Sequence, residues 1–357
     1  MQILKKKRLY FLSLIFICTM ISESKAQFSF EKISDYTIKI DENFILSSFL
    51  KGVMDKEGNI FYCDLTRILK FNSNGEFQKE IAPSGRGPGE FQTLIDCNVT
   101  ENYLVVLPFN EFRALFFNKS DMSYSHEFSL ESFRSRKFAI AEDSLLITIN
   151  DVSYGQTDKA LSVYDIDDKQ FLGANVDTPE MAYVGNTSEG GGLIAKSTEV
   201  FYLYISYPGI WRYNFKTGAS KYYNSVPDYF EESNFKELGS LKIPNDHRYY
   251  RGYMYNKSRS EGIYFLGKDK VVQMIATGNP WKSGSFNNSE VKYYLEIWDT
   301  QGNKLASKVP TPNNQRIEFT HGDNIYFNTG ELFAEESESL PVGSKLSLFE
   351  VYKMIAD

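Results

Sequence analysis

Two short sequence patterns alternate along this chain, and their recurrence limits the architectures that it can adopt. The first pattern is an apolar run followed by Asn or Asp and a turn. Its copies are Ile68–Phe71, Ala114–Phe117, Leu161–Tyr164, Ile210–Tyr213, Tyr294–Trp298 and Leu346–Phe349, the last without the turn. The second pattern is a short apolar strand before each of these: Asn59–Cys63, Tyr103–Leu107, Ser144–Ile149, Val200–Ile205, Gly262–Leu266 and Asn324–Phe327. Six copies of each pattern predict six repeats of one β-unit.

Copies of the second pattern start 41–62 residues apart, near the size of one propeller blade, and insertions account for the longer intervals. The abundant aromatic residues, 24 Tyr and 28 Phe, favour strands over helices. A small sheet that is apolar on both faces is not stable alone, but sheets stacked in a ring bury those faces. The sequence therefore predicts one all-β domain over residues 27–357, a six-bladed β-propeller with four-stranded antiparallel blades. Two β-sandwiches are the alternative, although the repeats continue without a break in composition.

The two ends of the chain predict how the ring closes. The last repeat stops at Tyr352–Asp357, soon after its third strand, and a spare strand-like segment, Phe28–Ile40, precedes the first repeat. We expect this segment to supply the outer strand of the last blade, because closure removes a free sheet edge.

Residues 1–26 have the pattern of a signal peptide. A basic stretch, Lys5–Arg8, precedes the apolar segment Leu9–Ile21. That segment has about 13 residues, too few to span a membrane. Small residues before Gln27 predict cleavage after Ala26, and hence secretion to the periplasm or the cell surface.

The cysteines leave two questions open. Lipidation at Cys18 is an alternative to cleavage, but a lipidation site needs a small residue before the cysteine, and Ile17 is not small. Cys63 and Cys97 lie in apolar, strand-like runs. A secreted protein permits a disulfide between them, but buried cysteines also serve as small apolar residues.

The stretch Asp55–Phe91 carries a resemblance to a known family. It reads Asp-x-x-Gly-Asn-Ile-Phe, then Ile-x-x-Phe-Asn-x-x-Gly-x-Phe, then Gly-x-Gly-Pro-Gly-Glu-Phe. It resembles one unit of the NHL-type six-bladed β-propellers. The form GRGPGEF is similar to a large group of secreted six-bladed propellers from Bacteroidetes, mostly of unknown function. The resemblance implies a ring with an axial channel but no activity, because propellers host binding proteins and enzymes alike.

The glycine-rich part of this stretch is interpreted as a structural motif. It comprises Gly85, Arg86, Gly87, Pro88, Gly89 and Glu90. A phosphate-binding loop needs a strand before it and a helix after it, whereas here a proline interrupts and a strand follows. We expect a tight turn between blades, with at least one of the three glycines at positive φ and with Glu90 and Arg86 in local bonds.

Cationic and aromatic side chains gather in the segments expected to enter the inner strands. These are Arg134 and Arg136, beside Lys137, in the third blade, His247, Arg248, Tyr250 and Arg251 in the fifth, and Arg316 in the sixth. The net charge of −7 argues against nucleic-acid binding, but a cleft that concentrates cations still attracts anions. The pattern predicts a basic pocket for an anionic small molecule, a glycan or a protein partner. Solvated strand ends, or arginines paired with carboxylates, are the alternative.

Three functions fit these features. The leading hypothesis is a non-catalytic propeller that binds its ligand or partner at one face. The second is a lyase or hydrolase that acts on an anionic glycan or peptide in the axial channel, with Tyr or His as acid and base. The third is an interaction module that uses exposed loops around Tyr207–Trp211 and Trp281. No cofactor is predicted, and a channel calcium ion would have only Asp96 and Asn98 as candidate ligands.

Overall fold

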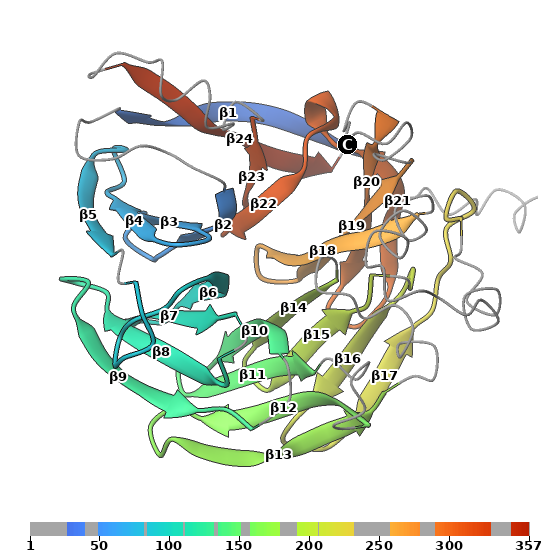
Figure 1. Cartoon of the computed structure of the whole chain (residues 1–357). Coiled ribbons are helices and arrows are strands. Elements are labelled where there is room, and N and C mark those ends of the chain that lie inside the picture. The colour runs from blue at the N-terminus through green and yellow to red at the C-terminus, as the bar shows by residue number, and fades with distance from the viewer. Residues whose placement is uncertain are drawn as a thin grey trace, which may run out of the picture.

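The computed structural model places almost every described residue in or between β-strands. It describes residues 27–39, 49–81, 84–109, 111–131, 135–150, 158–178, 191–205, 207–231, 258–278, 290–329 and 344–356. Within these ranges the strands form six four-stranded antiparallel sheets, arranged as the blades of a ring (Figure 1). The predicted six-bladed propeller is confirmed.

The first three blades follow one another along the chain, each running from the axis outwards. Blade one holds β2 (Phe49–Met54), β3 (Ile60–Asp64), β4 (Ile68–Phe71) and β5 (Phe77–Ile81). Blade two holds β6 (Leu94–Val99), β7 (Tyr103–Pro108), β8 (Arg113–Asn118) and β9 (Tyr124–Ser129). Blade three holds β10 (Ser135–Ala141), β11 (Leu145–Asn150), β12 (Lys159–Asp165) and β13 (Gln170–Asp177).

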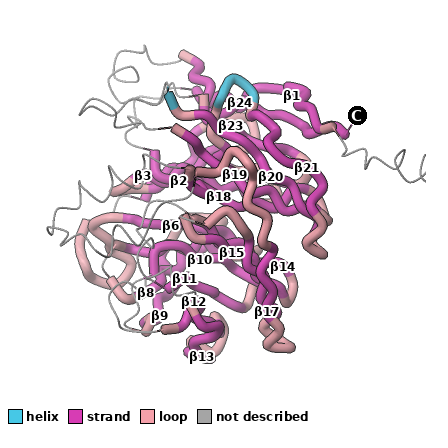
Figure 2. Tube along the Cα trace, turned by 90° about the vertical axis from the view of Figure 1, so that its right-hand side faces the viewer, coloured by secondary structure: helices cyan, strands magenta, loops and turns pink. Residues whose placement is uncertain are grey.

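The other three blades complete the ring. Blade four holds β14 (Gly192–Lys196), β15 (Glu199–Leu203), β16 (Ile210–Asn214) and β17 (Ser220–Tyr223). Blade five holds β18 (Arg259–Leu266), β19 (Lys270–Thr277), β20 (Lys292–Asp299) and β21 (Lys304–Pro310). Blade six holds β22 (Ile317–His321), β23 (Asn324–Asn328), β24 (Lys345–Ala356) and, outermost, β1 (Phe28–Lys39). A side view shows strands throughout, with a short helical turn beside β24 (Figure 2); this is the 3-10 helix Pro312–Asn314, which contacts Glu350.

The N-terminal strand closes the ring as expected. β1 pairs antiparallel with β24 from Phe28 opposite Ala356 to Lys39 opposite Lys345. The predicted segment reached Ile40, which lies outside the described residues. β1 also touches the first blade, because the Tyr36 hydroxyl donates a hydrogen bond of 2.7 Å to the Asn72 carbonyl.

The apolar core consists of layers between neighbouring blades. All five side chains of β3 are buried, and strand alternation sends them to two layers. Ile60 and Tyr62 pack with blade six, whereas Phe61 and Cys63 pack with blade two. The other interfaces hold corresponding clusters. Central strands that are apolar on both faces are therefore what a ring of stacked sheets requires.

Two further sequence questions are answered here. Cys63 of β3 and Cys97 of β6 form a disulfide that joins blades one and two. The assignment of Gly262–Leu266 as the second strand of blade five is wrong, because these residues end the innermost strand β18. The second strand is β19, which has the same apolar pattern one hairpin later.

Candidate functional site

The innermost strands share an irregularity near their first residues. In five blades the innermost strand skips one residue in its pairing with the second strand. The skips lie between Phe49 and Lys51, Leu94 and Asp96, Ser135 and Lys137, Ser260 and Gly262, and Ile317 and Phe319. Such a β-bulge sets two residues opposite one partner and re-aims their side chains. It brings charged residues to the same level of five blades around the axis.

Six charged side chains at this level form a group that we call the axial belt. They are Lys51, Asp96, Lys137, Glu261, Arg316 and Glu318. Lys137 interacts electrostatically with Asp96, Lys51, Arg316 and Glu318. Arg316 interacts in the same way with Glu318 and Glu261. The belt therefore acts as one electrostatic unit contributed by five of the six blades.

Three of the six belt side chains, Lys51, Asp96 and Glu261, form ion pairs within the protein. Asp96, almost completely buried, accepts hydrogen bonds from Lys51 Nζ at 2.7 Å and from the Phe138 amide at 3.0 Å, so it links the inner strands of blades one, two and three. Glu261 forms a buried ion pair with Arg259. These contacts hold neighbouring inner strands together at the level of the belt.

Asp96 and Asn98, the candidate calcium ligands named from the sequence, both have partners within the protein. Lys51 already neutralises the Asp96 carboxylate, and the Asn98 amide oxygen accepts a hydrogen bond from the Val99 amide. The described part of the chain holds no group of three or more His, Cys, Asp or Glu residues that could bind a metal ion.

Lys137 and Arg316 are the unpaired cations of the belt. Neither forms an ion pair or side-chain hydrogen bond with any residue that the structure describes. They belong to blades three and six, which lie opposite each other in a ring of six. Arg316 is exposed to water, yet protein surrounds it closely enough for burial to act on its pKa. A side chain on the wall of a water-filled channel meets both conditions.

The pKa values follow from this placement. Burial lowers the pKa of Lys137, which Asp96 partly offsets. Burial also acts to lower the pKa of Arg316, but Glu318 and Glu261 outweigh it and raise that pKa. Burial raises the pKa of Glu318 against the opposite effect of Arg316. The belt thus holds two cations, Lys137 and Arg316, and the carboxylate of Glu318, whose pKa values depend on one another.

A cavity of 370 Å³ continues from the belt along the axis. All six innermost strands line it. Representative lining residues are Val53, Asn98, Ile140, Ile194, Tyr264 and His321. The Tyr264 hydroxyl donates a hydrogen bond of 2.8 Å to the Ile317 carbonyl. The cavity and the belt together form the candidate site.

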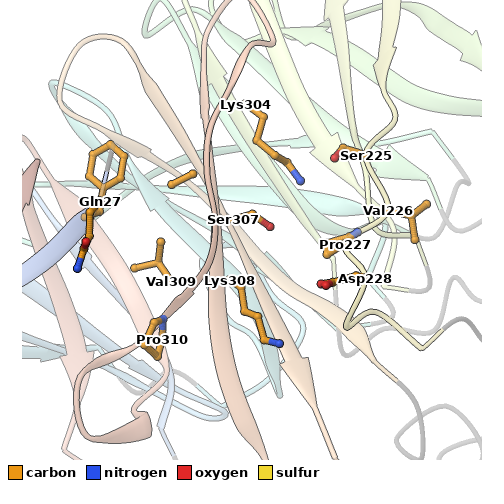
Figure 3. Close-up of a pocket in the computed structure, with 12 residues that line it drawn as sticks. Gln27, Ser225, Val226, Pro227, Asp228, Lys304, Ser307, Lys308, Val309 and Pro310 are labelled. Atoms are coloured by element: carbon orange, nitrogen blue, oxygen red, sulfur yellow. The ribbon is translucent and has the colours of Figure 1, made fainter. Parts of the chain in front are cut away.

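A larger groove, of 630 Å³, lies on the outside of the ring between β21 and the segment after β17. Lys304 and Ser307 project from β21 towards Ser225 and Asp228 on the facing segment (Figure 3). The charges behind this groove are satisfied, because the buried Glu296 carboxylate accepts hydrogen bonds from several groups. These are Tyr229 Oη at 2.5 Å, Lys304 Nζ at 2.5 Å, Ser307 Oγ at 2.8 Å and the Lys308 amide at 2.9 Å. We infer that these hydrogen bonds to Glu296 hold the 225–231 segment against blade five.

Of the predicted site residues, Arg316 lies in the belt. Arg136 occupies the bulge of β10, but its side chain lies outside what the structure describes. Arg134, His247, Arg248, Tyr250 and Arg251 also lie outside the described residues. The innermost strand of blade five is β18, which begins at Arg259. Sequence reasoning missed the roles of Lys51, Glu261 and Glu318, although each lies at the start of an inner strand.

The glycine-rich stretch is a structural turn. Gly89 has a φ of 73°, which confirms the expected positive φ. The Glu90 carboxylate accepts a hydrogen bond of 2.9 Å from the Gly87 amide, and Arg113 donates to the carbonyls of Gly87 (3.0 Å) and Glu90 (2.8 Å). Among the described residues, Arg86 donates a hydrogen bond to the Gln92 side chain alone, at 3.5 Å.

The aromatic loop proposed as an interaction surface is largely buried. Trp211 is 9 % exposed and stacks on Tyr222 with ring centroids 4.2 Å apart. Pro208, Gly209 and Ile210 are buried as well. These residues therefore fill the core of blade four, and Trp281 lies outside the described residues.

Comparison with known proteins identifies the family. A sequence profile described as a 6-bladed beta-propeller, DUF5128, matches residues 53–276, more than half of the chain. The chain belongs to the DUF5128 family. A search of curated proteins gave no match. No helix in the described part of the chain has the length and apolar character to cross a membrane.

Solved structures share the fold of this DUF5128 protein. A member of the DUF4221 family from Bacteroides vulgatus aligns with a TM-score of 0.65 at 11% identity, covering 94% of this chain and all of the other. A candidate exported protein from Bacteroides fragilis aligns with a TM-score of 0.58 at 14% identity, covering 94% and 96%. The WD40 repeats of RRP9 align with a TM-score of 0.53 at 10% identity, covering 92% and 100%. At these identities the similarity establishes the fold alone.

Proposed function

We propose that this protein is a non-catalytic propeller that binds an anionic group at the axial belt. The unpaired cations Lys137 and Arg316, on opposite blades, carry the proposal. An anion between them would contact both at once. It would also relieve their mutual repulsion, which contributes to the lowered pKa of Lys137. Arginine offers a bidentate fork to a carboxylate, sulfate or phosphate, and lysine adds a point charge.

The cations predicted from the sequence extend this proposal. In the sequence, Arg134 and Arg136 stand at or just before the start of β10, and His247, Arg248, Tyr250 and Arg251 precede β18. A protein of net charge −7 attracts an anion only where cations are concentrated in a cleft. A larger anionic ligand, such as a glycan or an acidic protein segment, would use these residues in addition to the belt.

Two tyrosines near Arg316 favour binding over catalysis. Burial raises the pKa of Tyr264 and of Tyr293, and neighbouring Arg316 offsets this only in part. A tyrosine acting as general base needs the opposite, a pKa lowered towards neutrality. A lyase or hydrolase mechanism based on these two residues is therefore the weaker candidate.

Export is part of the same proposal. Residues 1–26 have the pattern of a signal peptide cleaved after Ala26, and a structural neighbour from Bacteroides fragilis is a candidate exported protein. The disulfide between Cys63 and Cys97 fits an oxidising compartment. We also propose that Asp55–Phe91 is an NHL-type unit, since it contains β3, β4 and β5 of one blade followed by the turn to the next.

The proposal is tested by titrating the purified protein with sulfate and with acetate in a calorimeter. We expect K137Q and R316Q each to weaken anion binding by about tenfold, because each removes one charge-assisted hydrogen bond. K56Q, which alters an exposed turn lysine, should bind like the wild-type protein. Binding should weaken as salt rises. Equal anion affinity in all four proteins, or no binding at all, would refute the proposal.

A further inference from the structure

The backbone makes the axial cavity polar regardless of its side chains. Each innermost strand pairs with the second strand of its own blade and stands at the end of its sheet. Its other edge therefore presents backbone N–H and C=O groups towards the axis. Asp96 takes up one of them, the Phe138 amide. Thr320 and Tyr264 take up two more, the carbonyls of Phe265 and Ile317. Edge groups without such a protein partner require water or ligand atoms.

The cavity wall offers acceptors as well as donors. The strand edges supply carbonyl oxygens, and the Glu318 carboxylate accepts a hydrogen bond only from Asn328 Nδ2, at 3.1 Å, among the described residues. Two wall hydroxyls are already used as donors, Thr320 to the Phe265 carbonyl and Tyr264 to the Ile317 carbonyl. A ligand that fills the cavity must therefore donate hydrogen bonds in addition to carrying a negative charge.

This requirement separates two kinds of anion. The oxygens of sulfate or of a simple carboxylate only accept hydrogen bonds, so they cannot donate to the wall carbonyls or add to the hydrogen bond that Glu318 accepts from Asn328. A hydroxyl group both donates and accepts. The volume of 370 Å³ lies at the small end of the usual range for small-molecule sites.

We infer that the axial cavity binds a small polyhydroxylated carboxylate, that is, a sugar acid. Of the belt, only Lys51 and Glu318 line the cavity itself, so the carboxylate would have to extend beyond the cavity towards Lys137 and Arg316. Its hydroxyls would donate to Glu318 and to the carbonyl groups of the inner strands. Asn98, on the cavity wall, adds an amide that pairs with further hydroxyls. This inference rests on the proposed anion binding and adds the chemical class of the ligand.

Three matched probes test the inference by calorimetry on the wild-type protein. Glucuronate carries a ring, a carboxylate and hydroxyls, cyclohexanecarboxylate lacks the hydroxyls, and glucose lacks the charge. We expect glucuronate to bind about tenfold or more tightly than either control, because an unsatisfied wall group is costly. If cyclohexanecarboxylate binds as tightly as glucuronate, the sugar-acid inference fails and the anion site remains. If neither anion binds, the proposed function fails as well, and tight binding of glucose alone would refute both.

Substitution of Glu318 is an independent test, because it should change the affinities for cyclohexanecarboxylate and for glucuronate in opposite directions. E318Q removes a negative charge beside Arg316, so cyclohexanecarboxylate should bind a few-fold more tightly than to the wild-type protein. Glucuronate should instead bind a few-fold more weakly, because the amide is a poorer acceptor for its hydroxyls. N98A leaves the charges intact and should weaken glucuronate binding alone. If E318Q shifts both affinities in the same direction, Glu318 is not a hydroxyl acceptor and the inference fails.

Discussion

Gly89 lies where the exit turn of the first blade passes against the ring of Tyr124. Its φ of 73° favours glycine, and a Cβ atom there would lie 2.7 Å from the tyrosine ring. The chain is held in this position because Arg113 donates to two carbonyls of the same turn. Conformation and close approach therefore both require glycine at this residue.

We predict that G89A lowers the free energy of unfolding by about 3 kcal/mol, through left-handed strain plus the overlap with Tyr124. Gly218 provides a matched control, since its φ is +72° but nothing lies within 4 Å of the added Cβ. G218A should cost only the strain, about 1–2 kcal/mol. Urea denaturation measures both values. Equal losses would show that the Tyr124 contact contributes nothing.

Glu318 is expected to make stability depend on pH. Burial raises its pKa above the ordinary value of 4.5, so the folded state binds a proton more readily than the unfolded state. Its contribution to stability is complete below pH 4.5 and is lost as the pH rises through the raised pKa. E318Q should therefore be more stable than the wild-type protein at pH 7 and equally stable at pH 4.

Glu57 serves as the control of opposite sign. A hydrogen bond from Lys119 lowers its pKa, so its contribution to stability is present at neutral pH and is lost on acidification. E57Q should be slightly less stable than the wild-type protein at pH 7 and equal to it at low pH. Urea denaturation at both pH values distinguishes the two carboxylates. A stability difference for E318Q that does not change with pH would contradict the assigned pKa shift.

At the scale of single elements, the sequence predicted the central strands well. Runs such as Asn59–Cys63 are apolar at successive positions because both faces of a central strand are buried. The same rule produced the error in blade five, where the end of β18 is as apolar as β19. Innermost strands are harder to recognise, because one edge faces the channel and charged residues interrupt the apolar pattern.

The β-bulges explain why the site was only partly predictable. In a regular strand, Arg134 and Arg136 would lie on the same face. β10 instead has a bulge at Arg136, so alternation does not hold across it. Bulges have no strong sequence signal, and the pairing of Lys51 with Asp96 joins residues 45 positions apart. Arg316 was found because it directly precedes a recognisable strand.

The disulfide is the covalent link between the first two blades. It joins residues 34 positions apart, and closing a loop of that length in the unfolded chain corresponds to about 3–4 kcal/mol. C63A/C97A should lose that amount in urea denaturation. A reducing agent should destabilise the wild-type protein and leave the variant unchanged. A variant that keeps wild-type stability would show that the two cysteines act only as buried apolar groups.

At the scale of the whole molecule, stability depends on closing the ring. The six apolar clusters lie between blades, so each blade needs both neighbours. The cluster between blades six and one includes Tyr36 and Ile38 of β1. β1 further binds the first blade through the Lys39 amide, which donates to the Gly75 carbonyl at 3.2 Å. The repeat pattern predicted this closure because a ring with a missing outer strand would leave an open edge.

Removal of β1 should therefore open the ring. A chain that begins at residue 41 would expose one edge of β24, a strand of 12 residues, and would lose the side chains that seal blade six against blade one. We expect this truncated protein to associate through the free edge and to unfold at lower urea concentration. Size-exclusion chromatography with light scattering measures the association.

A synthetic peptide with the sequence of Phe28–Lys39 tests whether the truncated protein associates because the edge of β24 is exposed or because the whole domain is destabilised. Added to the truncated protein, it should pair with β24, restore the monomer and raise the unfolding midpoint as its concentration increases. A peptide of the same composition in scrambled order should do neither, because the alternation that buries Tyr36 and Ile38 would be lost. A truncated protein that remains monomeric and as stable as the full domain would show that the other described strands form the ring without this closure.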